Sequence, residues 1–278
     1  MKTNLVKGLF LLAIVAGIVF SVMIFTWNSV DSAIPYGANV TEITESSAQP
    51  DAASNNSALA GNVTELILFT YTTTQAWHGY YGNVSGTIQL ADSSDNVLYN
   101  WSLASPEGEV YATINGSVVW QNIQCFNFTA NGTYCAADLN NGGGTSECGM
   151  NESLLESAYG INHSSDDVDG VDESFSLDGS HELGGGFVHD EFMTNSKNFS
   201  SGECLSAHLF SSGTITDNLF QEVLLYSPDS ENIVFTAILD EDQQGFDGNY
   251  HDFQMIVLED GHGTDSSPTV YYFYVELE

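Results

Sequence analysis

Hydrophobic positions along the chain form one long uncharged run near the amino end, followed by many shorter runs of strand length. The long run covers residues 9–27 (LFLLAIVAGIVFSVMIFTW). As a helix it would be about 28 Å long, close to the roughly 30 Å hydrocarbon core of a bilayer. Lys2 and Lys7 precede it, and the positive-inside rule keeps such an end in the cytoplasm. The pattern predicts a single-pass membrane protein with a cytoplasmic N-terminus at residues 1–8, a transmembrane helix at residues 9–27 and an extracellular remainder.

Two other interpretations of the long run stay open. A cleaved secretory signal has an apolar core of about 7 to 15 residues and an A-x-A-like site, which Asp31-Ser32-Ala33 fits poorly. Lys7-Gly8-Leu9-Phe10 resembles the processing site of archaeal type IV pilin-like subunits, which would be cut after Gly8 to form an extracellular filament. In that family the helix usually continues into the head, whereas Pro35 and Gly37 interrupt it here. We therefore favour the uncleaved anchor.

The shorter runs begin only after a polar segment. Residues 28–61 are rich in Ser, Ala and Asn and poor in large apolar residues, which predicts a flexible stalk. Residues 62–278 alternate apolar runs with turn signals, and we expect an ectodomain of nine strands there. The expected strands are residues 64–71, 84–91, 96–103, 108–114, 117–124, 219–226, 232–240, 252–258 and 269–277.

Turn signals between the runs predict local hairpins. Asn115-Gly116 is a strong type I′ signal, and Ser227-Pro228-Asp229-Ser230 separates two later runs. In residues 271–277 (YYFYVEL) the alternation is that of a strand with one buried face, which leaves Glu276 on the open face. We expect an antiparallel meander in the first half. The fold class expected overall is all-β, an antiparallel β-sandwich ectodomain on one N-terminal transmembrane helix.

Residues 138–203 differ from the rest of the expected ectodomain. They are rich in Gly, Asp and Ser, and only residues 152–159 suggest a short helix. An irregular stretch of this length is uncommon inside a compact domain unless something holds it. We expect disulfides and metal to order this acidic insertion.

Four cysteines, in the oxidising compartment that the topology implies, predict two disulfides. None lies in a C-x-x-C arrangement, which removes haem attachment, a zinc knuckle and a thioredoxin-like motif. Three pairings are possible, and local pairing is slightly favoured because short loops close at lower entropic cost. Local pairing would join Cys125 to Cys135 and Cys148 to Cys204.

Acidic residues dominate the charge. The chain has 37 Asp and Glu against three Lys and no Arg, which gives a formal net charge of -34. Such a surface repels nucleic acid, whose phosphates need Lys and Arg for binding, so this class of partner is excluded. Solubility in strong brine is the favoured explanation of the charge, and divalent-metal sites are the specific alternative.

Two acidic loops are candidates for Ca²⁺, which accepts six to eight oxygen ligands in flexible geometry. Neither matches an EF-hand, and a solvated halophilic surface explains the first loop equally well and the second slightly better. The candidate ligands are Asp166, Asp167, Asp169, Asp172 and Glu173 in the first loop, and Asp240, Asp242 and Asp247 in the second, where Asp252 follows.

Asparagines in N-x-Ser/Thr sequons are more numerous than composition explains, and all eleven precede residue 200. On the outer side of a membrane they predict N-glycosylation. These residues are Asn39, Asn55, Asn62, Asn83, Asn100, Asn115, Asn127, Asn131, Asn151, Asn162 and Asn198.

A search for catalytic motifs yields none, so we do not expect an enzyme. His181 and His189 stand beside acidic residues and could bind a transition metal, but two exposed imidazoles on an acidic loop are favoured. Trp77, His78 and Tyr80 could stack on a sugar ring, although a place in the core is favoured. No cofactor other than Ca²⁺ is indicated.

Three segments, residues 77–86 (WHGYYGNVSG), 252–261 (DFQMIVLEDG) and 271–277 (YYFYVEL), resemble a group of archaeal surface proteins with an N-terminal anchor and an aromatic-rich β ectodomain. The resemblance covers residues 61–278 and implies compartment and architecture, with no activity attached. We therefore expect a structural or adhesive glycoprotein of a salt-adapted archaeal cell surface. Its partners would be the membrane, through residues 9–27, and other surface proteins, glycans or copies of itself. A filament subunit and a carbohydrate-binding or carbohydrate-active module are the alternatives.

Overall fold

The structure is a computed structural model that describes residues 34–41, 44–49, 51–103, 105–126, 152–161, 168–179, 186–213, 219–261 and 267–277. The expected transmembrane segment lies outside these residues. Within them, no helix has the length and apolar character needed to cross a membrane. Antiparallel strands make up most of the regular structure, which confirms the all-β fold class.

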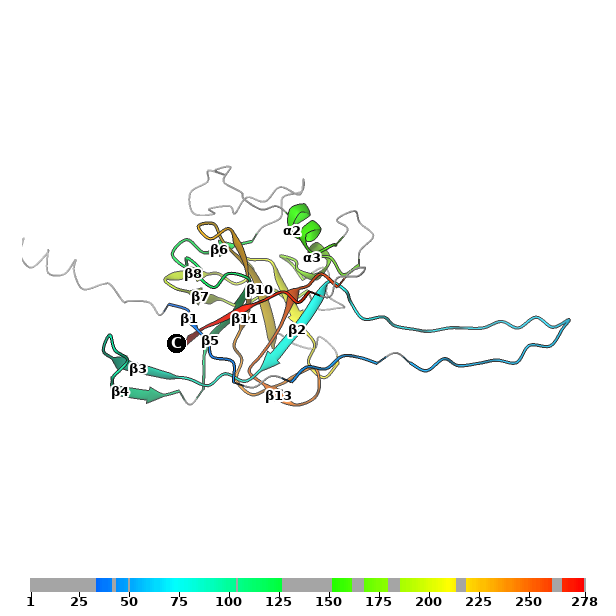
Figure 1. The fold of residues 1–278 in the computed structure, drawn as a ribbon, viewed down its shortest axis with the longest axis horizontal. Helices are drawn as coiled ribbons and strands as arrows, with labels where there is room; N and C mark the ends of the chain where they lie inside the picture. The colour runs from blue at the N-terminus through cyan, green and yellow to red at the C-terminus, as the bar shows by residue number, and fades with distance from the viewer. Residues whose placement is uncertain are drawn as a thin grey trace, which may run out of the picture. The chain divides into compact units, whose positions relative to one another are not determined.

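The main sheet has seven antiparallel strands, with the central ones side by side in Figure 1. β9 shares one edge of β10 with β6. The order across the sheet is β1 (Tyr36–Gly37), β15 (Tyr272–Leu277), β5 (Gly108–Thr113), β11 (Asn232–Ile238), β10 (Phe220–Ser227) and then β6 (Gln124–Cys125), while β9 (Ser206–Leu209) also pairs directly with β10.

β10 and β11 form the centre of the sheet, and both are buried at nearly every position. All eight residues of β10 are buried, and so are the five central residues of β11. Because side chains alternate between the two faces of a strand, both faces of these strands are covered. The two strands pair directly across the Ser227-Pro228-Asp229-Ser230 turn, which confirms the predicted hairpin.

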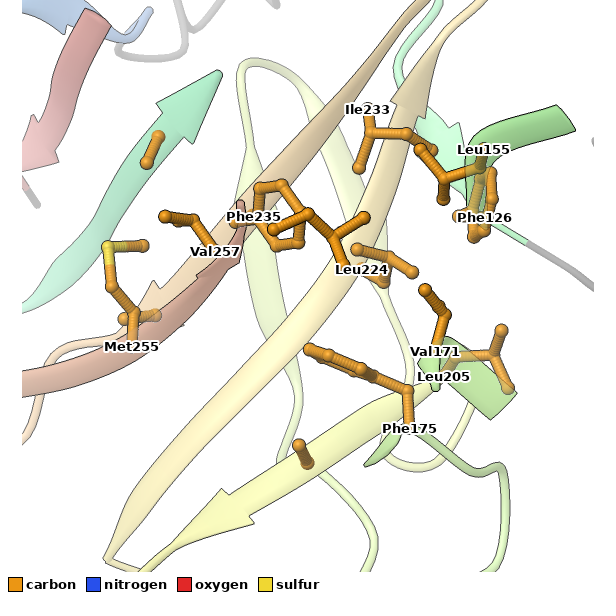
Figure 2. Close-up of a cluster of buried hydrophobic side chains, with 14 of the residues drawn as sticks. Phe126, Leu155, Val171, Phe175, Leu205, Leu224, Ile233, Phe235, Met255 and Val257 are labelled. Carbon is orange, nitrogen blue, oxygen red and sulfur yellow. The ribbon is translucent and has the colours of Figure 1, made fainter. Parts of the chain in front are cut away.

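A ribbon of two strands, β2 (Trp77–Gly82) and β14 (Phe253–Leu258), covers one face of the main sheet. β14 contacts both β10 and β11. In Figure 2, Val257 lies next to Phe235, with Leu224 beyond it and Met255 further along β14. These four residues are buried members of one hydrophobic cluster. The helices α2 (Glu152–Ala158) and α3 (Val171–Ser174) extend this cluster with Leu155 and Val171.

The other face of the main sheet is covered by the hairpin of β7 (Phe192–Thr194) and β8 (Lys197–Phe199). Phe192 and Phe199 stack with ring centroids 4.8 Å apart. They join a second buried cluster with Tyr111, Val223 and Val234. Two further hairpins complete the structure. They are β3 (Thr87–Ala91) with β4 (Val97–Ser102), and β12 (Gln243–Gln244) with β13 (Tyr250–His251).

A disulfide joins the two short strands that share the edge of β10. Cys125 ends β6 and Cys204 precedes β9, with Cα atoms 5.0 Å apart. The predicted local pairing of these two cysteines is wrong. β6 and β9 both pair with β10, and this brings Cys125 close to Cys204. Strand pairing has therefore already met the entropic cost of closing the loop between these two cysteines. Cys135 and Cys148 lie outside the described residues.

Several sequence predictions of strands fail. Residues 64–71 lie in no strand, and residues 117–123 likewise form none before β6 begins at Gln124. The hairpin predicted at Asn115-Gly116 is wrong because β5 pairs with β11 and β15, both more than a hundred residues away. The meander predicted for the first half is therefore limited to β3 and β4.

Two residue-level predictions also differ from the structure. Glu276, expected on an open face of the last strand, is buried because the β7–β8 hairpin covers that face. Tyr36–Gly37, inside the segment expected to be a stalk, form β1 and pair with β15. The helix signal at residues 152–159 is confirmed by α2.

Candidate functional site

Three acidic side chains converge where α2 meets α3. Glu156 comes from α2, and Asp172 and Glu173 come from α3. Each offers one carboxylate oxygen, and these three oxygens lie within 4.8 Å of one another. Asp172 and Glu173 were predicted as ligands from the first acidic loop. Glu156 was missed, because its only signal was a place in the predicted helix.

The two helices are positioned by Glu156 itself. Its Oε1 accepts the backbone N–H of Val171, at 2.8 Å, where α3 begins. Its carbonyl oxygen accepts the N–H of Ile161, at 2.9 Å, which turns the chain at the end of α2. Because Glu156 is buried, its carboxylate is held rigidly between the two helices.

Gly170 shows how closely the carboxylates crowd together. A Cβ atom at this position would lie 2.5 Å from Glu173 Oε2, 3.0 Å from Glu156 Oε1 and 3.3 Å from Asp172 Oδ1. A side chain at residue 170 would therefore displace the acidic groups. Glycine keeps the space between them open.

Electrostatics at this cluster are unfavourable for three separate negative charges. Burial raises the pKa of Glu173 to about 7, and hydrogen bonding to Asp172 and the charges of Asp172 and Glu156 add to the rise. The described part of the chain contains one lysine, Lys197, which donates instead to Ile123 O at 3.1 Å. The cluster therefore holds either a proton or a cation near neutral pH. Carboxylate oxygens suit a hard cation such as Ca²⁺ better than Zn²⁺, which prefers nitrogen and sulfur.

The remaining residues of the first loop do not join the cluster. Asp166 and Asp167 lie outside the described residues. Asp169 Oδ2 accepts Thr74 Oγ1 at 2.5 Å, and its carbonyl oxygen accepts Trp77 Nε1 at 2.6 Å. Asp169 therefore ties the loop to the start of β2.

Residues of the second loop are held apart by local hydrogen bonds. Asp240 Oδ1 accepts Gln243 Nε2 at 3.0 Å. Asp247 binds Asn249 and His251, and the bond from Asn249, the largest effect, helps lower the pKa of Asp247 to about 2. Among the described residues, Asp240, Asp242 and Asp247 do not come within ligand distance as a group. The structure thus favours the first loop over the second.

Asp252, at the end of the second loop, is an anchor. Its Oδ2 accepts the N–H of Val84 at 2.7 Å, and its Oδ1 accepts the N–H of Asp242 at 3.1 Å. The carboxylate is almost fully buried. It fixes the chain that leaves β2 to the loop before β12.

His189 is not the exposed imidazole that the sequence suggested. It is fully buried, its Nδ1 lies 2.7 Å from Asp190 O, and its Nε2 accepts the N–H of Cys204 at 2.8 Å. Burial lowers the pKa of this histidine. Both ring nitrogens are occupied, so a metal would have to displace one of these bonds. His181 lies outside the described residues.

The aromatic cluster at the start of β2 belongs to the core, as the sequence analysis favoured. Trp77 packs against Phe175 and Phe235, with ring centroids 5.9 Å and 6.5 Å away. Tyr80 contacts Phe273 edge-to-face at 5.0 Å. Their faces are therefore occupied by protein side chains.

Two buried acids under the β7–β8 hairpin were missed by the sequence analysis. Glu109 and Glu276 stand directly opposite each other on β5 and β15. Tyr111 donates its hydroxyl to Glu276 Oε2 at 2.9 Å and lies 3.3 Å from Glu109 Oε2. The N–H of Asn195 reaches Glu276 at 3.0 Å. These bonds dock the hairpin onto the sheet, which is a structural role.

A third missed acid, Glu222 on β10, lies between the two layers. It is fully buried, and its Oε2 accepts the N–H of Ile256 at 2.8 Å. Its Oε1 has no hydrogen-bond partner among the described residues. Burial raises the pKa of Glu222 well above its usual range, which favours the protonated form. Sequence pattern gave no sign of this, because a single acid in a strand usually faces solvent.

Sequon asparagines are at the surface wherever the structure describes them. Asn39, Asn55, Asn62, Asn83, Asn100 and Asn198 are exposed, and Asn115 is half-buried. Asn127, Asn131, Asn151 and Asn162 lie outside the described residues. Comparison with protein-family models, with known proteins and with solved structures gives no match for this chain.

Proposed function

We propose that the protein is a structural or adhesive glycoprotein of a salt-adapted archaeal cell surface. Residues 9–27 anchor it in the membrane with the N-terminus inside, and the all-β region is a β-sandwich ectodomain outside. The observation that carries the proposal is the number and placement of the sequons. Eleven occur, and six of the seven in the described residues are exposed. The Cys125–Cys204 disulfide adds support, because such bonds persist in oxidising compartments.

The experiment that tests the proposal uses the full chain with a C-terminal tag in a halophilic archaeal host. External protease added to whole cells should remove the tag, and intact mass should exceed the sequence mass by several glycans. A tag that stays protected until the cells are lysed would overturn the topology. Unmodified asparagines at every sequon would overturn the glycoprotein assignment.

The mature N-terminus separates the anchor from the filament subunit. Mass spectrometry of the native protein should find Met1 or Lys2 at the amino end if the segment remains an anchor. A new terminus at Leu9 would instead establish processing after Gly8 and would overturn the anchored form.

We further propose that Ca²⁺ occupies the cluster of Glu156, Asp172 and Glu173 and joins α2 to α3. The three carboxylates supply three of the six to eight oxygens that Ca²⁺ takes, and the cation offsets the burial and repulsion that raise the pKa of Glu173. Because the ligands must be ionised, the apparent affinity should rise about tenfold from pH 6 to pH 8.

The test is thermal unfolding of the full chain with millimolar Ca²⁺ against NaCl of equal ionic strength. Ca²⁺ should raise the melting temperature, and the double variant Asp172→Asn, Glu173→Gln should lose most of that rise. Glu107→Gln, at an exposed position, is the matched control and should keep it. Equal stabilisation by both salts would show that the cluster is solvated surface only.

A further inference from the structure

The β3–β4 hairpin has one apolar face that none of the described residues covers. In its register Ile88 stands opposite Trp101, and Leu90 stands opposite Tyr99. Because side chains alternate along a strand, these four lie on one face of the hairpin. They are 44%, 51%, 51% and 60% exposed respectively. Tyr99 and Trp101 contact each other edge-to-face, with centroids 5.0 Å apart.

The opposite face of the same hairpin is mostly polar, with Leu98 near the turn as an exposed apolar exception. Thr87 pairs with Ser102, and Gln89 pairs with Asn100. A lone two-stranded hairpin is marginally stable in water, and sorting of side chains by face is expected where one face is buried. The hairpin therefore has the pattern of a ribbon that packs against something on its apolar side.

A second apolar stretch is exposed in the described structure, although Tyr71 at its end donates its hydroxyl to Gln49 O at 2.9 Å. Residues 64–71 (TELILFTY) belong to no strand, although their composition is strongly β-prone. A run that is apolar at consecutive positions is typical of a strand covered on both faces. Five large side chains in this run are 49–94% exposed, namely Leu66, Ile67, Leu68, Phe69 and Tyr71.

Charge sets these two features apart from the rest of the molecule. Residues 66–91 and 96–106 contain no Asp, Glu, Lys or Arg, in a chain with a net charge of -34. Two copies of so acidic a protein repel each other over most of their surfaces, but the uncharged residues of these two features do not add to the repulsion. Interface centres are likewise depleted of charge and enriched in aromatic residues. Sequons also spare these features, since none lies between Asn62 and Asn83 and Asn100 is on the polar face of the hairpin.

Chain connectivity disfavours contact between the two features within one molecule. Residues 64–71 precede β2 and the β3–β4 hairpin follows β2, so the two features are attached to opposite ends of this strand. β14 holds β2 in place by pairing with it. The six residues of β2 span about 17 Å, and the connecting segments, residues 72–76 and 83–86, are short. A segment from another molecule has no such restriction.

We propose that a second copy of this chain covers the apolar face of the β3–β4 hairpin, with residues 64–71 of one copy docked on Ile88, Leu90, Tyr99 and Trp101 of the next. Nine side chains at on the order of 100 Å² each would bury roughly 900 Å², near the lower limit for a specific interface. The contact is therefore weak and reversible, and it strengthens with salt because salt screens the repulsion between copies. It deepens the proposed surface function by naming a partner, but it does not depend on glycans, Ca²⁺ or the anchor.

The test is sedimentation velocity of the full chain in detergent and high salt, at concentrations up to about 0.1 mM, which detects Kd values in the micromolar range. The wild type should associate. Phe69→Asp removes the docking segment and Trp101→Asp removes the acceptor face, so each variant alone should be monomeric. Gln89→Asp, on the polar face of the same hairpin, is the matched control and should associate as the wild type does.

Mixing the two defective variants gives the decisive result. Phe69→Asp retains an intact hairpin and Trp101→Asp retains an intact segment, so an equimolar mixture should form heterodimers. That result also shows that both variants are folded. A monomeric wild type, or a mixture that stays monomeric, would overturn the proposal. The apolar face of the hairpin would then be covered by another part of its own chain or by another kind of molecule. Self-association that all three variants retain would place the contact elsewhere and overturn it equally.

Discussion

At the scale of single residues, the buried acids decide how this protein responds to its medium. Glu222 lies buried between two layers of the fold, where desolvation raises its pKa, whereas Asp252 and Glu276 accept backbone N–H groups. A chain with three lysines cannot neutralise its buried acids with ion pairs. Buried acids are accommodated instead by a raised pKa or by main-chain N–H donors. Stability falls with rising pH in the first case and increases with pH in the second.

Glu222 makes stability fall as the pH rises. Folding raises its pKa above the ordinary value of 4.5, so the native state keeps a proton that the unfolded chain releases. The free energy of unfolding should therefore fall as the pH rises above about 4.5, by on the order of 1 kcal/mol per pH unit, until the native pKa is passed. Glu222→Gln still offers an acceptor for Ile256 and cannot ionise, so its stability should lose this slope.

Urea unfolding at several pH values measures the effect of Glu222. The window ends at pH 9 because tyrosines begin to ionise near pH 10. Glu107→Gln is the control and should keep the wild-type slope. Parallel pH profiles for the wild type and Glu222→Gln would show that this carboxyl group is not protonated in the native state.

At the scale of elements, hydrogen bonds to buried carboxylates position chain segments that lie outside helices and strands. The carboxylate of Asp252 links the chain after β2 to the loop before β12, and the carboxylate of Glu156 links α2 to α3. Each replaces a backbone partner that a longer strand or helix would have supplied. Such links are the reason that short elements hold fixed positions here.

Asp252→Ala tests this use of anchors. Two backbone N–H groups, those of Val84 and Asp242, lose their acceptor in a buried site, and the expected loss of stability is about 2–4 kcal/mol. Asp252→Asn retains one good acceptor and should lose less. Asp51→Ala, in an exposed segment, should change stability by less than about 0.5 kcal/mol. Chemical denaturation of the three variants gives the ranking, and an effect of Asp252→Ala no larger than that of Asp51→Ala would contradict the anchoring role.

Sequence patterns predicted strand pairing only where it is local, although the distantly paired strands β5, β14 and β15 were also expected close to their observed bounds. The hairpins β10–β11 and β3–β4 and the helix α2 follow directly from apolar runs and the turns between them. Residues 64–71 have the same kind of pattern but no partner strand, and pattern alone does not say whether a partner is available. Asn115-Gly116 failed for the related reason that β5 finds better partners far along the chain.

The candidate site shows the same division between local and distant signals. Asp172 and Glu173 were predicted because they lie together in an acidic stretch. Glu156 joins them only through the packing of α2 on α3. The pairing of Glu109 with Glu276 depends on β5 and β15, two strands that are far apart in the sequence. Spacing along the sequence carries no information on contacts of this kind.

At the scale of the whole molecule, the main sheet is built from both ends of the all-β region. β15, the last strand, lies between β1 and β5, and β5 pairs in turn with β11. The Cys125–Cys204 disulfide then closes a loop with a sequence separation of 79. The stability of the sheet therefore depends on contacts that only the complete chain can make.

Removal of this disulfide should be costly. Closing a loop of this length restricts the unfolded chain, and the double variant Cys125→Ser, Cys204→Ser should lose about 4 kcal/mol of stability. A peptide map of the unreduced protein should show the Cys125–Cys204 bond, and we expect the two remaining cysteines, Cys135 and Cys148, to form the other. A bond between Cys125 and Cys135 in the native protein would contradict the structure. Unfolding of the double variant at the wild-type denaturant concentration would contradict the stabilising role.

The order of cysteines along the chain has a consequence for export. Under the export proposed above, the chain would cross the membrane amino end first, and Cys135 and Cys148 would reach the oxidising side before Cys204. β10, which aligns Cys125 with Cys204, would follow later still. Early oxidation would then favour the wrong partner for Cys125, and the native bond would require thiol–disulfide exchange on a timescale of seconds to hours. Maturation of this protein would accordingly be limited by the supply of a disulfide isomerase or a reducing thiol outside the cell, and not by its synthesis.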